Sequence, residues 1–526
     1  MAPNSWIGWG GSILNRRLAA SDATITQRNV GSILKTCEHR YEPAGVSASP
    51  LVLDGTAYYP TWTGLLVALD YKSCDVLWTS NITKMILDFA PRTEVQVASG
   101  VNPVSRTSPV TDGSRLYVGT LAHALVLAID RDTGELISHV QIDDHPVALI
   151  TQSPTWHDGQ LLVGTSSFEI ITASHPGYSC CDHVGSMNSV IIEKGALKLR
   201  WKTMMIVQPE GLTGDLFSGA SVWGSSPVVD TARDVVYIAT GNTHSIPDET
   251  GACQLAQNET GIVFPDPCLP PNVYQESVLA LDLATGDIKW ARQLGVLDAW
   301  NMACALLPVG AECPPLPGLD SDFGMGPTLI PGDGAKTPDG KDLIVIGQKN
   351  GNLYGISPET GEVLWLTEAS PPGLEGGLSW GIAADDTAVY FTAINNARTP
   401  YIAVDGQIIH NTAFGAAALI DGRIVWQTSS PNDTVSMMAP TVVNDIVFTG
   451  TSGKTGDNGF PQGTGSLVAL DKATGKIIRE DKLEDFFHGG IAVAQGYLMF
   501  GTGYQSGLQP PVAGSFQVWK TTSCIG

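Results

Sequence analysis

The sequence predicts an all-β fold, an eight-bladed β-propeller of four-stranded antiparallel blades, formed by residues 1–526 as a single domain. Its composition is rich in turn-forming residues, with 58 Gly and 33 Pro in 526 residues and only 15% charged side chains. Glycine and proline interrupt helices and end short strands. A unit of strand, turn and strand also recurs along the chain, and a second type of strand precedes each copy. These three observations favour radially repeated sheets.

The repeated unit joins its two strands through a turn of the form Asp-x-x-Thr-Gly. The glycine supplies the positive φ that this turn needs, and the aspartate can accept hydrogen bonds from backbone amides across it. Clear copies are SVLALDLATGDIKW at 277–290, SLVALDKATGKIIR at 466–479, NLYGISPETGEVLW at 352–365 and LVLAIDRDTGELIS at 125–138. Weaker copies cover 64–78, 188–201 and 414–426, and an eighth is implied near 515–520. Tryptophans that end many copies are expected to pack between blades: Trp78, Trp201, Trp290, Trp365 and Trp426.

Eight partner strands of the form Gly-x-x-Tyr-x-x-Thr/Gly, such as DGSRLYVGT and RDVVYIATG, come before these units. Eight such pairs fit eight four-stranded blades. Because the two ends of a propeller chain usually share one blade, we expect N- and C-terminal strands to close the ring, with Trp6–Trp9 as the N-terminal part. Function is expected in the longest loops, at 142–156, 166–188, 204–222, 243–276 and 291–325.

Charge and motif content exclude several classes of function. A formal net charge of −23 argues against nucleic acid or an anionic membrane as a partner, since both need a cationic surface. No run of about 18 apolar residues occurs, so no membrane span is expected. No CxxCH motif occurs, so no covalently attached c-type haem is expected. A small molecule is therefore the expected partner.

Cysteines and glycosylation sequons predict a secreted glycoprotein in its mature form. Sequons begin at Asn81, Asn258 and Asn432. The nine cysteines include Cys253 with Cys268 and Cys304 with Cys313, which lie in Pro- and Gly-rich loops where a short-range disulfide would restrain the chain. The start, MAPNSW, is compatible with a mature terminus after signal removal.

Cys180 and Cys181 stand side by side in SCCDHVGSM. Adjacent cysteines can close only a strained eight-membered ring, so bonding to each other is possible but uncommon. No Cys or His lies at zinc spacing from the pair. We therefore expect a structural role, either as a vicinal ring or as two separate bridges that anchor the loop over a pocket.

The Ala-Leu-Asp-x-x-Thr-Gly-x-x-x-Trp repeat covers essentially the whole chain and resembles the quinoprotein propellers that bind pyrroloquinoline quinone. The segments GWGGSILNRR, SSPVVDTARDVVYIATGN, WARQLGVLDAWNMAC and GQKNGNLYGISPETGEVLW resemble the polyvinyl-alcohol-dehydrogenase-like group in particular. That resemblance implies a calcium ion held by Glu169 and Asn242, a cation at Lys349 and a stacking face at Trp223. Hard oxygen ligands of this kind suit Ca²⁺.

The same comparison shows departures from the family pattern. Asn301 stands where the alcohol dehydrogenases carry an aspartate, and a neutral amide cannot act as a base. Asp298, Asp320 or Asp322 would have to substitute for it. Val184 stands where an arginine is expected and Ile170 where a second acid is expected, and Lys349 and Lys202 are the basic residues near the expected site. Because the quinone carries three carboxylates that need partners when buried, the sequence predicts an eroded quinone site.

Three hypotheses follow from these observations. The favoured one is a redox-silent enzyme that uses the old pocket without any cofactor, similar to the fungal hetero-Diels-Alderases of tropolone sesquiterpenoid biosynthesis. Such a pericyclase would dehydrate a planar oxygenated tropolone alcohol to a quinone methide and join it to an apolar macrocyclic terpene. The alternatives are a quinone- and calcium-dependent alcohol dehydrogenase and a non-catalytic binding module.

The favoured hypothesis needs groups that move a proton and a cavity that orients two substrates. The catalytic candidates are His183, His244, Asp298, Asp322 and Lys349. The binding candidates are Glu169, Met204, Phe217, Trp223, Asn242, Asn301 and Trp380. The sequence gives no expectation for the oligomeric state.

Overall fold

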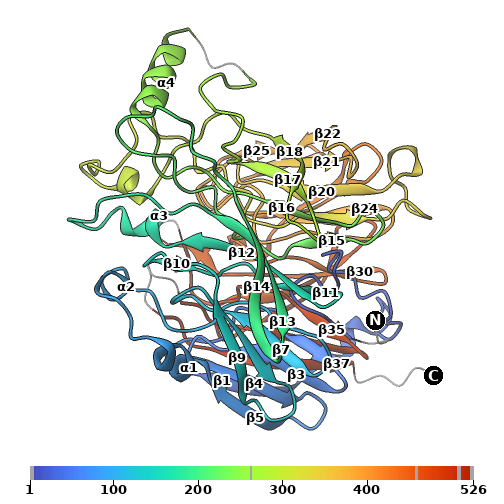
Figure 1. The fold of residues 1–526 in the computed structure, drawn as a ribbon. Coiled ribbons are helices and arrows are strands. Elements are labelled where there is room, and N and C mark those ends of the chain that lie inside the picture. Colours follow the sequence, from blue (N-terminus) through green and yellow to red (C-terminus); the bar gives the residue numbers. More distant parts are fainter. Residues whose placement is uncertain (1–4, 261–263, 457–459, 506–510, 522–526) are drawn as a thin grey trace.

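The computed structural model describes residues 5–260, 264–456, 460–505 and 511–521, and over these residues the predicted eight-bladed propeller is confirmed (Figure 1). Each of eight sheets contains a path of four strands that pair antiparallel with their neighbours. One of these sheets, blade 3, carries a further short strand at its edge. The fold is therefore built by repetition of one sheet, as the repeated unit indicates.

The first four blades follow the chain in order. Blade 1 contains β2 (Leu51–Leu53), β3 (Thr56–Pro60), β4 (Leu65–Asp70) and β5 (Asp75–Asn81). Blade 2 contains β6 (Val110–Thr111), β7 (Arg115–Gly119), β8 (Leu125–Asp130) and β9 (Leu136–Gln141). Blade 3 contains β10 (Ala148–Leu149), β11 (Thr155–His157), β12 (Gln160–Ser167), β13 (Ser186–Glu193) and β14 (Ala196–Met204). Blade 4 contains β15 (Val228–Asp230), β16 (Val235–Ala239), β17 (Ser277–Asp282) and β18 (Ile288–Gln293).

The last four blades complete the ring. Blade 5 contains β19 (Thr328–Ile330), β20 (Leu343–Gly347), β21 (Asn352–Ile356) and β22 (Val363–Glu368). Blade 6 contains β23 (Ala383–Ala384), β24 (Ala388–Ala393), β27 (Ala413–Ala418) and β28 (Ile424–Ser429). Blade 7 contains β29 (Thr441–Val443), β30 (Ile446–Thr451), β33 (Ser466–Asp471) and β34 (Ile477–Lys482). Blade 8 contains β35 (Ala492–Ala494), β36 (Tyr497–Gly501), β37 (Gly514–Thr521) and β1 (Ile33–Tyr41).

Short elements decorate the loops between strands. Two small hairpins are β25 (Tyr401–Ile402) with β26 (Ile408–Ile409) and β31 (Lys454–Thr455) with β32 (Pro461–Gln462). The α-helices are α1 (Ile82–Phe89), α2 (Glu94–Ala98), α3 (Glu169–Thr172) and α4 (Asp248–Thr260), and the 3-10 helices are η1 (Val30–Ser32), η2 (Met302–Ala305), η3 (Pro338–Gly340) and η4 (Pro431–Asp433). Helix α4 stands away from the sheets at the top of Figure 1. Among the described residues, no helix is long and apolar enough to cross a membrane.

The ring is closed by β1, which pairs with β37 from Ile33 opposite Thr521 to Tyr41 opposite Gly514. The expectation that Trp6–Trp9 supplies the closing strand is wrong, because this segment forms only a single bridge, between Trp6 and Val52. A closing strand must offer a run of backbone groups to the open edge, and the nine residues of β1 do so.

The repeated turns also connect neighbouring blades. Asp282 Oδ1 accepts hydrogen bonds from the backbone amides of Ala284 and Thr285, at 2.8 and 3.0 Å. A Cβ at Gly286 would lie 2.6 Å from the Trp201 ring, so only glycine fits between the turn and that ring. Trp201 Nε1 donates to the carbonyl of Leu283 in the next blade. The predicted packing between blades is confirmed, since the other members donate in the same way: Trp78, Trp290, Trp365 and Trp426.

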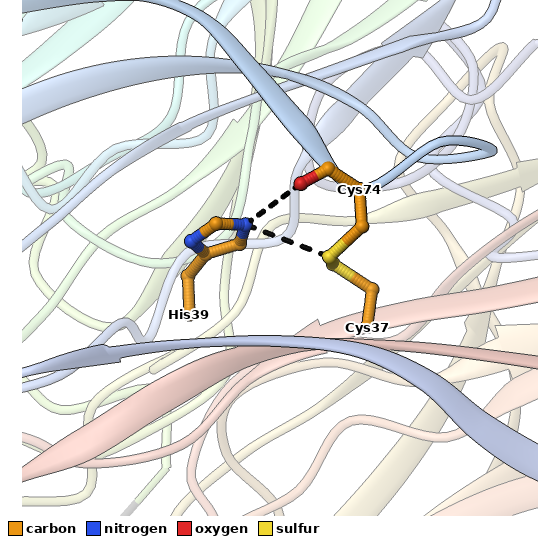
Figure 2. A group of neighbouring side chains, drawn as sticks. All are labelled: Cys37, His39 and Cys74. Atoms are coloured by element: carbon orange, nitrogen blue, oxygen red, sulfur yellow. Dashed lines mark hydrogen bonds between the residues drawn. A yellow bond between two sulfur atoms is a disulfide. The ribbon is translucent and has the colours of Figure 1, made fainter.

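A disulfide between Cys37 and Cys74 joins the closing strand β1 to the turn after β4 (Figure 2). Beside it, His39 Nε2 lies 3.1 Å from the backbone oxygen of Cys74. Because both sulfurs belong to the disulfide, this group is a covalent clasp between blades 8 and 1 rather than a metal site.

Candidate functional site

A cavity of about 240 Å³, here called the central cavity, is lined by loops from seven of the eight blades. Residues next to the inner strands of blades 1 to 6 and of blade 8 reach it, so it lies on the axis of the propeller. Six of the predicted site residues line it: Trp223, Asn242, His244, Asp322, Lys349 and Trp380. The apolar side chains of the remaining wall are Trp62, Val101, Leu121, Leu149, Phe168, Ile170 and Ile171.

Lys349 is the buried cation of this cavity. Its Nζ lies 2.8 Å from Asp320 Oδ2 and 3.4 Å from Asp322 Oδ2. Burial lowers the pKa of Lys349, but the two carboxylates outweigh burial and hold that pKa above its usual value. The ammonium group also lies 5.5 Å from the ring centroid of Trp223. Lys349 is therefore charged at any physiological pH.

Asp322 connects the residues around Lys349. Its Oδ2 accepts from Trp223 Nε1 at 3.1 Å, and its Oδ1 accepts from the backbone amide of Asn242 at 2.6 Å. The side-chain amide of Asn242 donates to the carbonyls of Thr243 and Trp300, at 2.9 Å each. Asn242 Oδ1 is thereby left as an oxygen acceptor for a ligand in the cavity. The aromatic face, the cation, the acid and the amide are held as one unit.

Glu169, at the start of α3, lies just outside the cavity wall and is fully buried. Its carboxylate accepts hydrogen bonds from Tyr178 Oη and from the backbone amides of Asp182 and His183, at 2.9 to 3.0 Å. One of its oxygens, a His244 ring nitrogen and Cys181 Sγ lie within 4.8 Å of one another. Glu169 thus holds the cysteine-bearing loop and borders the cavity through His244.

Cys180 and Cys181 form the vicinal ring, one of the two arrangements that the sequence leaves open. The pair is buried and packs against Ala173 and Ala303. Ser245 Oγ donates to the Cys181 carbonyl at 3.1 Å, and the Cys180 amide donates to Glu312. The bridges Cys253–Cys268 and Cys304–Cys313 are also present. The pair therefore anchors the loop next to the central cavity but does not line it.

Two predicted acid–base residues do not line the central cavity. Asp298 lines a second cavity, where its carboxylate accepts from the backbone amides of Asp320 and Ser321, at 3.3 and 2.8 Å. His183 is buried with its Nε2 3.6 Å from Asp143 Oδ2. By contrast, His244 lines the central cavity, and burial lowers its pKa to about 4, so its imidazole is neutral near pH 7.

Three predicted binding residues also lie elsewhere. Asn301 caps η2, because its Oδ1 accepts from the amide of Ala303 while its Nδ2 donates to the carbonyls of His244 and Glu312. Phe217 is fully buried in the core near blades 3 and 4. Met204 ends β14 and is 37% exposed, so it does not form an apolar wall of the cavity.

Arg106 is a lining residue that the sequence analysis missed. Its Nη1 lies 3.4 Å from Tyr504 Oη, which also lines the cavity. Among the described residues, no carboxylate lies within 4.0 Å of its guanidinium. Lys202, which the sequence offered as a second cation, pairs with Asp143 at 2.8 Å and does not line the cavity.

Arg106 could have been found from the sequence by its position relative to a proline that precedes the innermost strand of several blades. The residue three positions before this proline faces the axis in five blades: Ser47, Arg106, Thr151, Gly224 and Gly324. Both Arg106 and Thr151 reach the central cavity. Alignment of the blades on this proline would have found them.

Comparison with known proteins gives the class of the fold and then the family. The propeller is similar to the quinohemoprotein alcohol dehydrogenase ADHIIG of Pseudomonas putida HK5, with a TM-score of 0.70 and 17% identity over 100% of this chain and 81% of that one. It is also similar to a europium-containing methanol dehydrogenase, with a TM-score of 0.69 and 16% identity over 98% of each chain. The PQQ family model for the β-propeller domain of glucose/ethanol/alcohol dehydrogenases matches residues 6–314. The chain belongs to this family.

Two relatives are named as polyvinylalcohol dehydrogenases. The one from Sphingopyxis sp. (strain 113P3) is 25% identical over 535 residues, which cover 98% of this chain and 72% of the relative. The one from Pseudomonas sp. is 27% identical over 397 residues, which cover 74% of this chain and 55% of the relative. The match thus spans little more than half of the Pseudomonas relative.

The expectation of an enzyme without a cofactor is wrong. The family model is that of the PQQ propellers, and further relatives are named as quinone alcohol dehydrogenases. The cavity also fits such a group, because it offers a flat indole face at Trp223 and two cations, Arg106 and Lys349, for acidic substituents. Two buried polar atoms of its wall residues, Ser221 Oγ and His244 Nδ1, have no hydrogen-bond partner among the described residues. A polar planar ligand would provide partners for them.

Proposed function

We propose that this protein is a quinone-dependent alcohol dehydrogenase that holds pyrroloquinoline quinone in the central cavity. One observation carries this proposal: the cavity brings together the Trp223 ring, the buried Lys349 ammonium and the Arg106 guanidinium, which has no carboxylate partner among the described residues. A planar ligand with several carboxylates needs this combination when it is removed from water. Membership in the PQQ propeller family supports the same conclusion.

Different residues of the chain would bind different parts of the quinone and its calcium ion. Trp223 offers its face to the rings, while Arg106 and Lys349 bind acidic and quinone oxygens. Asn242 Oδ1, with the carboxylate of Glu169 behind His244, offers hard oxygen ligands for a calcium ion. When bound, the quinone supplies the two-electron oxidising power that an alcohol dehydrogenase needs.

Asp322 is the residue that we assign to the substrate hydroxyl proton. It is the one carboxylate among the described residues that line the central cavity. Asn301 cannot take the proton, because it is a neutral amide, and it does not line the cavity. Hydrogen bonds from Trp223 Nε1 and from the Asn242 amide fix the orientation of the Asp322 carboxylate. Asp322 thus replaces the base that the family carries at position 301.

The wall of the cavity indicates the class of alcohol. Leu121, Leu149, Phe168 and Ile171 present an apolar surface, which suits a hydroxyl carried on an apolar carbon chain. We therefore propose secondary alcohols of the polyvinyl alcohol type, the substrate in the names of the two relatives. The described chain has no CxxCH motif, so electrons would pass to an acceptor outside it. The relatives named above favour the dehydrogenase over the hetero-Diels-Alderase hypothesis.

Four disulfides are present among the described residues, which favours an oxidising compartment over the cytoplasm. We propose that the protein is secreted. Its sequon residues Asn81, Asn258 and Asn432 are exposed and accessible to glycosylation. Mass spectrometry of the protein from a eukaryotic secreting host tests both points.

The test of the function is calorimetric titration of the purified protein with pyrroloquinoline quinone and Ca²⁺, followed by dye reduction with secondary alcohols. We expect saturable binding at micromolar concentration or below, and activity that depends on the quinone. R106Q and K349Q should each weaken binding about tenfold or more, because each removes a charged partner of a buried anion. Lys202→Gln is the matched control, since Lys202 does not line the cavity. Absence of quinone binding would overturn the proposal.

A further inference from the structure

Another cavity, of about 40 Å³, lies on the propeller axis next to the central cavity and is distinct from the one lined by Asp298; we call it the axial cavity. The two cavities share five wall residues: Arg106, Thr151, Trp223, Trp380 and Tyr504. The other residues of the axial cavity come from the N-terminal segment and from the inner ends of blades 1, 3, 4, 5 and 8. Its volume suits one or a few atoms rather than an organic molecule.

Several wall residues of the axial cavity carry a buried polar atom that has no partner among the described residues. Trp9 Nε1, Ser225 Oγ, Trp380 Nε1 and His488 Nδ1 are buried there and have no hydrogen-bond partner among the described residues. A Cβ built on Gly381 would lie 3.3 Å from Trp9 Nε1 and 3.7 Å from Ser225 Oγ, so these two atoms lie close to each other. Leaving several polar atoms unsatisfied in one place is costly, and native proteins rarely do it.

These groups are mostly hydrogen-bond donors. The indole N–H groups of Trp9 and Trp380 and the guanidinium of Arg106 can donate but cannot accept. A water molecule accepts only two hydrogen bonds, whereas a bare anion accepts from every donor around it. The excess of donors therefore favours an anion over water.

The charges around the axial cavity also favour an anion. Neither Asp nor Glu is among its described wall residues, although the chain has a net charge of −23. The Arg17 guanidinium lies 5.0 Å from the ring centroid of Trp9 and is fully buried, and its hydrogen-bond partners among the described residues are carbonyl and hydroxyl oxygens. Arg106 likewise has no carboxylate within 4.0 Å among the described residues. Two arginines without carboxylate partners make this part of the interior electropositive.

We propose that the axial cavity is a binding site for a small monovalent anion of about the size of chloride, held by Trp9, Trp380, Ser225 and Arg106. The anion balances the charge of the two arginines, of which Arg17 is fully buried, and accepts hydrogen bonds from the donors of the wall residues. This inference concerns the chain without any quinone, so it does not depend on the proposed function. Arg106 then serves both cavities, with the anion on one side and the acidic ligand of the central cavity on the other.

The test uses the full-length protein without quinone and replaces sodium gluconate by sodium chloride or bromide at constant ionic strength. Gluconate is too large for a cavity of about 40 Å³. We expect a saturable rise in the melting temperature with either halide. Crystals grown with bromide should show an anomalous peak between Trp9, Ser225 and Trp380. A featureless salt response together with no anomalous peak would overturn the proposal.

Trp9→Phe keeps the ring and removes the donor, so the halide midpoint should rise about tenfold or more. Trp6→Phe is the matched control: Trp6 also lies against Arg17, at 5.5 Å, and its Nε1 is also buried without a partner, but it does not line the axial cavity. Its halide midpoint should stay that of the unmodified protein. Ser225→Ala is the second test variant if Trp9→Phe does not fold, and it should weaken halide binding in the same direction. Equal midpoints for the unmodified protein and these variants would contradict the site.

Discussion

Lys349 Nζ lies 2.8 Å from Asp320 Oδ2, and both side chains are buried. Lys349 also lines the central cavity, together with Asp322. The pair joins the end of β20 to the loop before β19. Burial raises the pKa of Asp320 well above its usual value, although Lys349 acts against this. The Lys349 ammonium is therefore the neighbouring group that favours the charged form of the Asp320 carboxyl.

Removing the cation should be costly for stability as well as for binding. Lys349→Met leaves Asp320 and Asp322 without their partner, and losing one member of a buried pair typically costs about 3 to 5 kcal/mol. We expect a loss of at least about 3 kcal/mol in the free energy of unfolding, measured by urea titration. Lys202→Met, which breaks a pair that is 26% exposed on the lysine side, should cost clearly less. Equal losses would contradict this assignment.

Replacing Asn301 by the aspartate of the family pattern should lower the free energy of unfolding. Its Nδ2 donates at 3.0 Å to the His244 carbonyl and at 2.7 Å to the Glu312 carbonyl. Asn301→Asp would place a charged oxygen against carbonyl oxygens inside the protein, so we expect a loss of about 2 kcal/mol or more at pH 7. The loss should shrink at pH 4 to 5, where a protonated carboxyl can donate again. A variant that is as stable as the parent at pH 7 would show that position 301 tolerates a base.

The fold could be predicted from the sequence because the same strand–turn–strand pattern recurs in the blades. The turn at Asp282 to Gly286 needs both its acid and its glycine, and Trp201 packs where that glycine leaves room. Such local rules are visible in one copy and confirmed by the others. The strand that closes the ring could not be predicted in this way. β1 pairs with β37 at the open edge of blade 8, and this pairing joins distant parts of the chain without a local sequence pattern to mark it.

The site could be predicted only in part, for a related reason. Trp223, Asn242 and Lys349 stand in segments that resemble the family, and they do line the cavity. Arg106 was missed because its position became meaningful only when separate blades were superposed on the axis. Asn301 was expected to contact a ligand, yet its side-chain amide donates to two backbone carbonyls instead. Residue type can indicate chemistry, but the direction of a side chain depends on tertiary contacts.

Burial of His488 predicts a specific dependence of stability on pH. Burial, with a contribution from Arg106, lowers the pKa of His488 to about 3. Unfolded histidine titrates near 6.5, so between these values the unfolded chain binds a proton that the folded chain does not. His488 therefore destabilises the fold as pH falls below about 6.5.

The measurement compares the unmodified protein with H488Q in urea at pH 7.5 and pH 5.0. The unmodified protein should lose about 2 kcal/mol more than the variant over this range. His410→Gln is the control, because His410 is exposed. A pH response that is the same in H488Q and in the unmodified protein would show that His488 titrates normally in the folded state.

The clasp between blades 8 and 1 should matter more than the other short-range bridges (Figure 2). Cys37 and Cys74 are 37 residues apart, whereas Cys304 and Cys313 are 9 apart. Since a longer closed loop restricts the unfolded chain more, removing the first bridge should cost roughly 4 kcal/mol and removing the second roughly 3 kcal/mol. Denaturant unfolding of the C37A/C74A and C304A/C313A proteins measures both losses. β1 is the edge strand of blade 8 and closes the ring. In the C37A/C74A protein, the β1–β37 amides should therefore exchange their hydrogens before the amides of the other blades. Uniform protection of these amides in that variant would mean that strand pairing, without the clasp, is enough to hold the ring closed.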